Sequence, residues 1–389
     1  MNIYYWCPFI DYVATVKAVL NSSLAVNKYS KNLHQSIVVN SIGEWDQYSN
    51  FLEKNKIEQI RLTENKNIYK NLPRNSYLKS RLSYIIISIY TVYNLIKFLK
   101  KRTQNDLIIL HLVTSLPLIL INILNFECKF ILRISGYPKL NIFRKFLWKI
   151  SSKNLLKIFV PTIETKEKLI NEYVFEKDKM LVLRDPIIDI REINKRVDQS
   201  DSNKEKKNTI VSIGRLTKQK NHQFLIKTFS QIVKDKKDLK LKILGKGELK
   251  KDLENLINEK GLKNNIELVG HVDNIYKYLD NSFCFILTSR WEDPGFVIIE
   301  SAAAKVLILT SDCESGPKEF IEKNETCGYL YKEGDEDSFI KKFNEMYNDY
   351  FSNQDLIKNK RLYAFRKTRL YSKFNHFKEL KKFLDDLKD

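Results

Sequence analysis

Short apolar runs alternate with amphipathic stretches along most of this chain. In the second half, runs typical of buried strands recur at regular intervals, and most are followed by a stretch with helical periodicity. The strands expected there are 209–213, 239–244, 266–269, 283–287, 306–310 and 329–331. In the less regular first half, the strands expected are 3–6, 36–39, 107–110, 130–134 and 158–160. The alternation predicts an α/β protein with doubly wound parallel sheets.

The same pattern predicts two domains. A chain of 389 residues is too long for one ordinary hydrophobic core. Segment 191–207 is charged and lacks apolar periodicity, which predicts a linker between a first domain at 1–190 and a second at 208–364. The tail, 365–389, carries an apolar stripe at helical spacing, and we expect it to cross back and brace the first domain.

Segment 84–96 is a strongly apolar predicted helix. Ser88, Thr91 and Asn94 recur along it every three residues and predict a polar stripe, and basic residues flank both ends. The apolar stretch is shorter than the ~20 residues that a membrane span needs, so we expect an amphipathic helix. It lies either on its own domain or on lipid. Segment 116–124 is expected to be a core helix.

The amino-acid composition limits which binding partners and which cellular compartment we expect. The formal net charge of +20 is consistent with binding to a polyanion, either nucleic acid or an anionic membrane surface. A compositional bias toward lysine on solvated surfaces explains the charge equally well. Nucleic acid is not expected, because no zinc-finger, helix-turn-helix or RNA-binding pattern occurs. The five cysteines include no Cys-x-x-Cys pair, which favours a reducing compartment over a disulfide framework or zinc site. The first residues lack the basic region of a signal peptide.

Two carboxylates, Glu292 and Glu300, flank Gly295 at the start of an apolar helix. We expect Glu292 in the loop after strand 283–287 and Glu300 about one turn inside the helix. Gly295 permits close backbone approach, and the free N–H groups at a helix start favour an anion. With one carboxylate for each end of a ligand, this arrangement predicts a nucleotide-sugar site.

Glycine turns follow several predicted strands of the second domain. Gly214 and Arg215 follow one strand, and Lys220 is close enough along the chain to converge with Arg215 on a diphosphate. Alternatively, Lys218, Lys220 and Lys227 form a solvated helix surface. The other glycines expected at this sheet edge are Gly245, Gly247, Gly270 and Gly316. A tight strand-to-helix turn explains the first two of these as well, but the gathering of glycines at one edge predicts a ligand approached by backbone.

The first domain offers fewer candidates. His111 follows strand 107–110, where its imidazole either contacts a sugar hydroxyl or lies satisfied in the core. Arg133, Ser135 and Gly136 end another strand at the same predicted edge. The next helix combines basic and aromatic residues, which suits either an anionic, lipid-linked acceptor or an ordinary solvated face.

These motifs resemble a known family of enzymes. The spacing of Glu292 and Glu300 is similar to the Glu-x7-Glu signature of retaining glycosyltransferases of family four, and 214–220 resembles the family's diphosphate-binding Gly-Arg…Lys set. Segments 291–297 and 311–319 resemble a branch that builds capsules and O-antigens. The resemblance implies the GT-B fold, in which two Rossmann-like domains face each other across a cleft.

The resemblance also implies how the donor would be held. Glu300 would bind the ribose hydroxyls of a nucleoside-diphosphate sugar, which we expect to be a UDP-sugar. Glu292 would hold the transferred sugar together with the backbone of Gly295, Phe296 and Val297. The acceptor implied is a lipid-linked oligosaccharide, and the donor's anomeric configuration would be retained.

Four side chains would carry the chemistry on this basis. Arg215 and Lys220 would neutralise the leaving diphosphate, so that neither a metal ion nor another cofactor is needed. His111 matches the family histidine that contacts the donor sugar near its anomeric carbon, and Glu292 completes the set. Gly214, Gly245 and Gly270 would line the donor site with their backbone.

The chain departs from the family in one loop. The Gly-Gly turn that usually follows the first strand is missing, and Thr15 is the remaining candidate there for an acceptor contact, beside Arg133, Ser135 and Gly136. We expect a cytoplasmic enzyme, peripheral at the inner face of the plasma membrane. The alternatives are a nucleotide-sugar epimerase of the same fold and a non-catalytic, basic, membrane-associated partner subunit.

Overall fold

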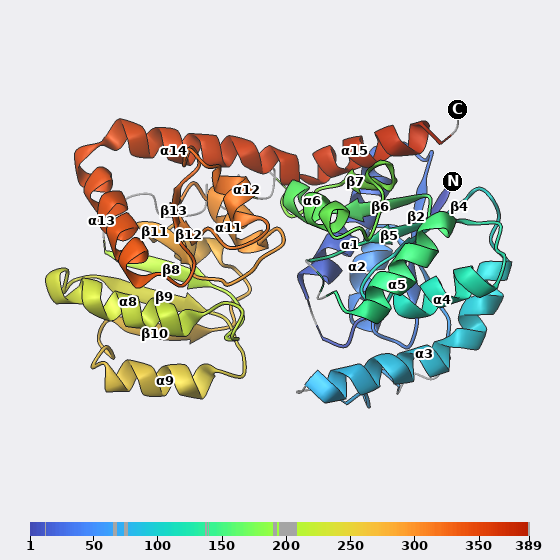
Figure 1. Ribbon diagram of the computed structural model, residues 1–389, viewed down its shortest axis with the longest axis horizontal. Coiled ribbons are helices and arrows are strands. Elements are labelled where there is room, and N and C mark those ends of the chain that lie inside the picture. Colours follow the sequence, from blue (N-terminus) through green and yellow to red (C-terminus); the bar gives the residue numbers. More distant parts are fainter. Residues whose placement is uncertain are drawn as a thin grey trace. The chain divides into compact units, whose positions relative to one another are not determined.

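The computed structural model describes residues 1–11, 13–64, 68–73, 77–136, 138, 140–189, 193 and 208–387. They form two compact units, shown in Figure 1. Unit 1 contains Met1–Ile187 and Lys373–Asp389, and unit 2 contains Ile188–Ser372. The first segment of unit 1 ends close to the predicted 190, whereas unit 2 begins at Ile188 and not at 208, and ends at Ser372 and not at 364. Of the predicted linker, 191–207, only Ile193 lies within the described residues.

Unit 1 is built on one parallel sheet with the strand order β3-β2-β1-β4-β5-β6-β7. Its strands are β1 (Asn2–Trp6), β2 (Gln35–Asn40), β3 (Glu58–Arg61), β4 (Asp106–Leu110), β5 (Lys129–Arg133), β6 (Lys157–Val160) and β7 (Met180–Val182). The predicted strands are confirmed to within about one residue, the usual uncertainty of a strand end. The sequence pattern missed β3 and β7, which are the two edge strands.

Helices cover both faces of this sheet. They are α1 (Ala14–Tyr29), α2 (Ser49–Lys54), α3 (Tyr77–Lys100), α4 (Ser115–Ile123), α5 (Ile142–Ser151), α6 (Ile163–Asn171) and α15 (Lys373–Asp385). Because side chains alternate along a strand, Tyr4 and Trp6 of β1 enter a core with α3, α4 and α5. Ile3 and Tyr5 enter a second core with α1 and α15. The predicted core helix at 116–124 is α4, which buries Leu118.

The tail of the chain is divided between the two units. Helix α14 (Gln354–Lys367) and a 3-10 turn (Thr368–Tyr371) lie in unit 2, and α15 lies in unit 1. The apolar stripe expected along 365–389 is therefore not one helix. Phe377 and Leu380 of α15 are buried in the core that α1 also lines. Inside it, the His376 ring is 2.7 Å from Ser22 Oγ and 2.7 Å from the Arg184 carbonyl oxygen, and burial lowers its pKa to about 4.

Unit 2 is also built on one parallel sheet, with the strand order β10-β9-β8-β11-β12-β13. Its strands are β8 (Thr209–Ile213), β9 (Lys240–Leu244), β10 (Ile266–Gly270), β11 (Cys284–Leu287), β12 (Leu307–Ser311) and β13 (Tyr329–Tyr331). The helices around them, besides α14, are α8 (His222–Asp235), α9 (Lys250–Glu259), α10 (Tyr276–Leu279), α11 (Phe296–Ala303), α12 (Pro317–Ile321) and α13 (Glu336–Ser352). The six strands predicted for this half are confirmed to within about one residue.

Helix α3 differs from its prediction in two ways. It extends over 24 residues, Tyr77–Lys100, and not only over 84–96. Thr91, expected on a polar stripe, is fully buried, and its hydroxyl donates to the Ile87 carbonyl oxygen at 2.6 Å. This back-bond satisfies the hydroxyl within the helix, so threonine can face the core. Several Leu, Ile and Tyr side chains of α3 are exposed instead.

The length of α3 also changes its relation to membranes. Within the part of the chain that the structure describes, Leu78–Lys100 is one helix of 23 residues that is long and apolar enough to cross a bilayer, with 33% of its most apolar window buried. The prediction that this segment is too short for a span is therefore wrong. Length and composition alone are weak evidence, because core helices meet the same criteria.

Candidate functional site

The carboxyl ends of β8 and β11 bring most of the predicted donor residues together. These neighbouring strands mark the point in unit 2 where the strand order reverses, which is where open α/β sheets bind ligands. The β8–α8 loop carries Gly214, Arg215 and Lys220, and the β11–α11 loop carries Glu292 and Gly295. The sequence prediction of one sheet edge for these residues is confirmed.

A buried ion pair joins the two loops. The Lys220 ammonium donates to the Glu292 carboxylate, and the two side chains are only 11% and 7% exposed. The Ser289 hydroxyl donates to the same carboxylate oxygen at 2.5 Å. Desolvation of two charges is costly unless they are paired and hydrogen-bonded, and both conditions hold here. The pair therefore places a fixed cation and a fixed anion side by side at the strand ends.

Arg215 lies on the same loop but is exposed to solvent. Its guanidinium has a long contact with Gln219 Oε1 at 3.4 Å, and Gln219 Nε2 donates to the Trp291 carbonyl oxygen at 2.9 Å. The Arg290 amide also donates to the Gln219 carbonyl oxygen at 2.9 Å. The guanidinium therefore stands on a braced loop, where its planar fork suits bidentate binding of phosphate.

Helix α11 begins where the sequence predicted. Gly295 is its N-cap, with φ of 81°, a value in the left-handed region that favours glycine. Phe296 and Val297 form the first turn, so their amides are among the N–H groups that an α-helix leaves unpaired. Glu300 follows about one turn later, as predicted, and is 8% exposed.

The glycines of this edge have a more local explanation than the ligand approach that the sequence suggested. A Cβ on Gly245 would lie 1.9 Å from the Gly214 carbonyl oxygen, and one on Gly247 would lie 2.3 Å from the Leu216 carbonyl oxygen. The Leu216 amide donates to the Lys246 carbonyl oxygen at 2.9 Å, so the two turns are pressed together. For this pair, the structure supports the alternative of tight turns. Gly270, with φ of 86°, has no heavy atom within 4 Å of such a Cβ.

Gly316 lets a third loop approach the donor loop. Its φ is 100°, and a Cβ there would lie 2.3 Å from the Pro294 carbonyl oxygen. We expect Gly316→Ala to displace 293–295 and to destabilise the protein by about 1–3 kcal/mol, the usual cost of overpacking. The matched control is Gly334→Ala, because Gly334 also has positive φ, of 74°, but no atom within 4 Å of a Cβ. Thermal denaturation of both variants measures the effect, and equal losses would contradict it.

His111 lies in unit 1 at the carboxyl end of β4, next to the point where that strand order reverses. Its amide donates to the Trp6 carbonyl oxygen at 2.7 Å, but its ring is 5% exposed and neither ring nitrogen has a hydrogen-bond partner among the described residues. Burial, then the charges of Arg133 and His376, hold the pKa of His111 well below its ordinary value. The imidazole is thus neutral and, contrary to one alternative, not a satisfied core histidine. A buried unpaired polar group of this kind calls for a functional explanation.

The other candidate residues of unit 1 are those predicted to contact the acceptor. Arg133 is buried, with its guanidinium 2.6 Å from the Leu183 carbonyl oxygen and 2.5 Å from Asp185 Oδ1, so it connects β5 to the segment after β7. This ion pair gives Arg133 a structural role, and the acceptor-side role expected for it stays a prediction. Ser135 and Gly136 follow it, half-buried, and Thr15 lies half-buried in the first turn of α1. Tyr137, between the predicted acceptor residues and Pro138, lies outside the described residues.

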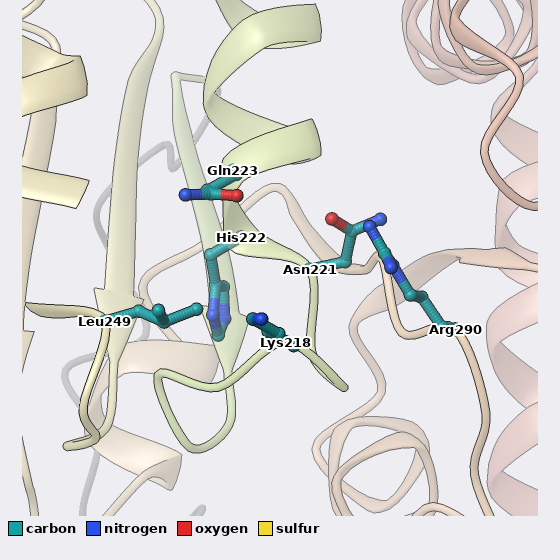
Figure 2. A pocket seen from close by; sticks show the side chains of 6 residues that line it. All are labelled: Lys218, Asn221, His222, Gln223, Leu249 and Arg290. Carbon is teal, nitrogen blue, oxygen red and sulfur yellow. The ribbon is translucent and has the colours of Figure 1, made fainter. Parts of the chain in front are cut away.

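A cavity of about 260 Å³ opens beside the β8–α8 loop in unit 2. It is lined by Lys218, Asn221, His222, Gln223, Leu249 and Arg290. In Figure 2 the His222 ring stands between Leu249 and Lys218, and Arg290 extends beside Asn221. Burial lowers the pKa of His222 to about 3, so its ring is neutral. None of the residues predicted to hold the donor lines this cavity, so it is a separate feature of the loop.

Sequence reasoning missed the hydroxyl groups that fix the β11–α11 loop to the β8–α8 loop and to the end of β12. Thr288 Oγ1 donates to the Lys220 carbonyl oxygen at 3.0 Å, and Ser311 Oγ donates to the Ser289 carbonyl oxygen at 2.6 Å. The available signal was their position, since Thr288 and Ser289 directly follow the apolar strand β11. Hydroxyls at the end of a buried strand need partners, and here those partners belong to the neighbouring loop.

Comparison with known proteins gives a family match for most of unit 2. The family described as glycosyl transferases group 1 matches residues 194–363, which include both loops of the site. An uncharacterised glycosyltransferase of Methanocaldococcus jannaschii is 31% identical over 251 residues. A Campylobacter jejuni enzyme, N-acetylgalactosamine-N,N'-diacetylbacillosaminyl-diphospho-undecaprenol 4-alpha-N-acetylgalactosaminyltransferase, is 33% identical over 183 residues. These matches cover 59% and 47% of this chain, and the chain spans 61% and 48% of the two relatives.

A solved structure matches over nearly the whole chain. A mutant form of Staphylococcus aureus TarM, in complex with fondaparinux, alpha-GlcNAc-glycerol and UDP, aligns with a TM-score of 0.75 at 15% identity. The alignment covers 98% of this chain and 99% of that one. At this identity the likeness shows the fold alone. The chain has the GT-B fold of two Rossmann-like domains, as the sequence predicted.

Proposed function

We propose that this protein is a retaining glycosyltransferase of family four that moves a sugar from a UDP-sugar to a lipid-linked oligosaccharide. The observation that carries the proposal is the sheet edge of unit 2, where Arg215, Lys220 and Glu292 meet at the switch point and Glu300 follows in α11. The group 1 family match includes all four residues and supports the assignment. The process proposed is the synthesis of a bacterial surface polysaccharide such as a capsule or O-antigen.

The main task of such a site is to stabilise the negative charge on the leaving diphosphate. Arg215 is exposed, and its guanidinium matches two phosphate oxygens at once. Lys220 adds a point charge that the Glu292 carboxylate and the surrounding loops hold in place. Fixed cations of this kind stabilise charge that develops in the transition state without reorganising. We propose that these two side chains do this work without a divalent ion or another cofactor.

The remaining roles concern the sugar and the nucleoside. Glu300 would accept hydrogen bonds from the ribose hydroxyls, and Glu292 with the α11 amides would hold the transferred sugar. Neutral His111, with both ring nitrogens unpaired among the described residues, would contact the sugar near its anomeric carbon. Retention would follow from attack of the acceptor hydroxyl on the face that the diphosphate leaves, with a diphosphate oxygen as the base.

The choice of substrates rests on relatives. The TarM structure contains UDP, and the Campylobacter jejuni relative is named for transfer to a sugar on diphospho-undecaprenol. By analogy with these proteins we propose a UDP-sugar donor and a polyprenyl-diphosphate-linked acceptor. All five cysteines are buried and free, consistent with our proposal that the enzyme works in the cytoplasm at the inner face of the plasma membrane.

A transfer assay with the full chain tests this function. The protein is incubated with individual UDP-sugars and a polyprenyl-diphosphate-linked saccharide, with and without EDTA. We expect UDP release and a product whose new linkage keeps the donor's anomeric configuration by NMR, unaffected by EDTA. If no nucleotide sugar raises the melting temperature and none is turned over, the proposal fails and a non-catalytic partner subunit is favoured.

An epimerase of the same fold is the enzymatic alternative. It would convert a nucleotide sugar to its epimer without any acceptor, using acid and base side chains at the reacting carbon. Incubation of the donor alone distinguishes the two activities. A transferase gives at most slow hydrolysis under these conditions, whereas accumulation of an epimer would support the alternative.

Glu300→Gln tests the nucleoside contact. The glutamine keeps the shape but loses the charge, and a hydrogen bond to a charged group contributes about 1.5–3 kcal/mol. We therefore expect KM for the UDP-sugar to rise by roughly 10- to 100-fold with a smaller change in kcat. Glu254→Gln, on the exposed surface of α9, is the matched control. An unchanged donor KM in the Glu300 variant would remove this residue from the donor site.

A further inference from the structure

Large apolar side chains are concentrated on the surface of three helices of unit 1, α3, α4 and α5. More than half of the large hydrophobic side chains that are exposed in the described residues lie on these helices. Exposed apolar patches of this kind mark interaction sites.

Helix α3 has two apolar faces. One is buried against unit 1 and includes Ile87 and Leu95. The other faces solvent: Leu82, Ile85 and Ile89 follow at helical spacing with exposed fractions of 49%, 56% and 67%. The helix is therefore held in the fold by one side and presents Leu and Ile on the other.

The exposed face continues over the next two helices. Helix α4 packs against both α3 and α5, and Figure 1 shows the three together in unit 1. Ile142 and Phe143 at the start of α5 are each 84% exposed, and Ile123 at the end of α4 is 73% exposed. Burial and the Asp11 charge raise the pKa of Tyr84 on α3, and the Arg144 charge on α5 opposes this rise.

Charge on these helices has one sign. Segment 77–102 contains six Lys or Arg residues and no Asp or Glu, and α5 contains three basic residues and no acidic one. Segment 107–126, which includes α4, has no charged residue. Lys97 and Lys100 near the end of α3, and Lys149 on α5, are exposed to solvent. Acidic side chains beside these helices include Asp11, which acts on Tyr84, and Glu172, which pairs with Lys145. An apolar face bordered mainly by cations is complementary to an anionic lipid surface.

We propose that the joint surface of α3, α4 and α5 docks unit 1 on an anionic lipid bilayer. The exposed Leu, Ile and Phe side chains enter the boundary between headgroups and acyl chains, and the lysines contact lipid phosphates. A membrane span does not fit, because the opposite face of α3 forms part of the core of unit 1. A symmetric contact with a second copy does not fit either, because it would bring the same predominantly basic helices face to face.

This inference deepens the proposed function by assigning the membrane contact to helices α3, α4 and α5. It rests on the proposed function only for the idea that the acceptor is lipid-linked. Its test needs neither donor nor acceptor. The full chain is mixed with vesicles of phosphatidylcholine alone or with added phosphatidylglycerol, and bound protein is measured by flotation. We expect binding that requires phosphatidylglycerol and weakens as salt is added, because salt screens the lysines.

Substitutions on α3 test whether the exposed apolar face is the part of the protein that binds vesicles. Ile85→Glu/Ile89→Glu should lower the vesicle partition coefficient by roughly tenfold or more, because apolar burial is lost and anionic charge is added. Leu33→Glu, between α1 and β2 and 56% exposed, is the matched control and should bind as the wild type does. Lys97→Gln/Lys100→Gln should reduce binding chiefly at low salt. Circular dichroism and melting temperature confirm that each variant is folded.

Two results would overturn the assignment. One is vesicle binding that is equal for the wild type and the Ile85→Glu/Ile89→Glu variant. The other is a concentration-dependent dimer of the wild type, measured by sedimentation without lipid, that this double variant abolishes. Loss of glycosyl transfer in a variant that still binds vesicles would count against the proposed function and leave the docking surface intact.

Discussion

Lys220→Ala is expected to lower kcat/KM for the UDP-sugar by about 10²- to 10³-fold, the usual loss when one fixed electrostatic contact to a developing charge is removed. Lys220 is held in place at the switch point of unit 2, since its side chain is only 11% exposed and its ammonium is paired with Glu292. A steady-state assay that measures UDP release at several donor concentrations checks the prediction. Lys227→Ala, on the exposed surface of α8, is the matched control.

The same substitution also affects stability, and the two effects have to be separated. Without Lys220, the Glu292 carboxylate, 7% exposed, keeps the hydrogen bond from Ser289 but loses its counter-charge, and an unpaired buried charge costs about 3–5 kcal/mol. Lys220→Ala/Glu292→Gln removes that charge and should recover much of the melting temperature while activity stays low. Activity of Lys220→Ala within about twofold of wild type at full melting temperature would exclude Lys220 from catalysis.

The strands of unit 2 were predictable because their signals are local. Each is rich in apolar residues, and five of the six, β8 to β12, end at or next to a glycine, serine or threonine. The edge strands of unit 1 carry no such signal. Strand β3 combines Glu58 and Arg61 with partly exposed neighbours, and β7 is only three residues long. Edge strands are half-exposed and short, so their composition approaches that of a loop.

Helix α3 shows a different limit of sequence reasoning. Its polar residues were assigned to a solvent face because a hydroxyl usually seeks water, but Thr91 satisfies its hydroxyl on the Ile87 carbonyl oxygen. Once that bond is made, threonine is as suitable for the core as a small apolar residue. The sequence period identified the helix correctly, but it does not say which of two apolar faces packs inward.

In the candidate site, too, the sequence identifies residues from local signals but does not identify their contacts. Gly214, Arg215, Lys220, Glu292 and Glu300 were found from the sequence because strand ends and spacing define them. What each of them contacts depends on tertiary packing. The Lys220–Glu292 pair joins loops 72 positions apart, and the reason for Gly245 is a carbonyl oxygen on another loop. The structural role of Arg133 was missed for this reason, because its partner Asp185 lies 52 positions away.

Arg133→Met is expected to destabilise the protein by about 3–5 kcal/mol, because it leaves Asp185 charged and unpaired in a buried site. The two side chains are 3% and 10% exposed, and the guanidinium also caps the Leu183 carbonyl oxygen. Urea unfolding followed by tryptophan fluorescence suits the measurement, since Trp6, Trp45 and Trp148 all lie in unit 1. The midpoint should fall strongly with little change in the slope.

Arg133→Met/Asp185→Leu separates the structural role from the acceptor role that the sequence suggested. Replacement of a whole buried ion pair by apolar residues is often neutral or stabilising, so the double variant should unfold close to the wild-type midpoint. If Arg133 acts only through this pair, KM for the acceptor should then be close to the wild-type value. A stable double variant whose acceptor KM is raised about tenfold would instead show that the guanidinium contacts the acceptor, since a lost contact of that size corresponds to roughly 1.4 kcal/mol.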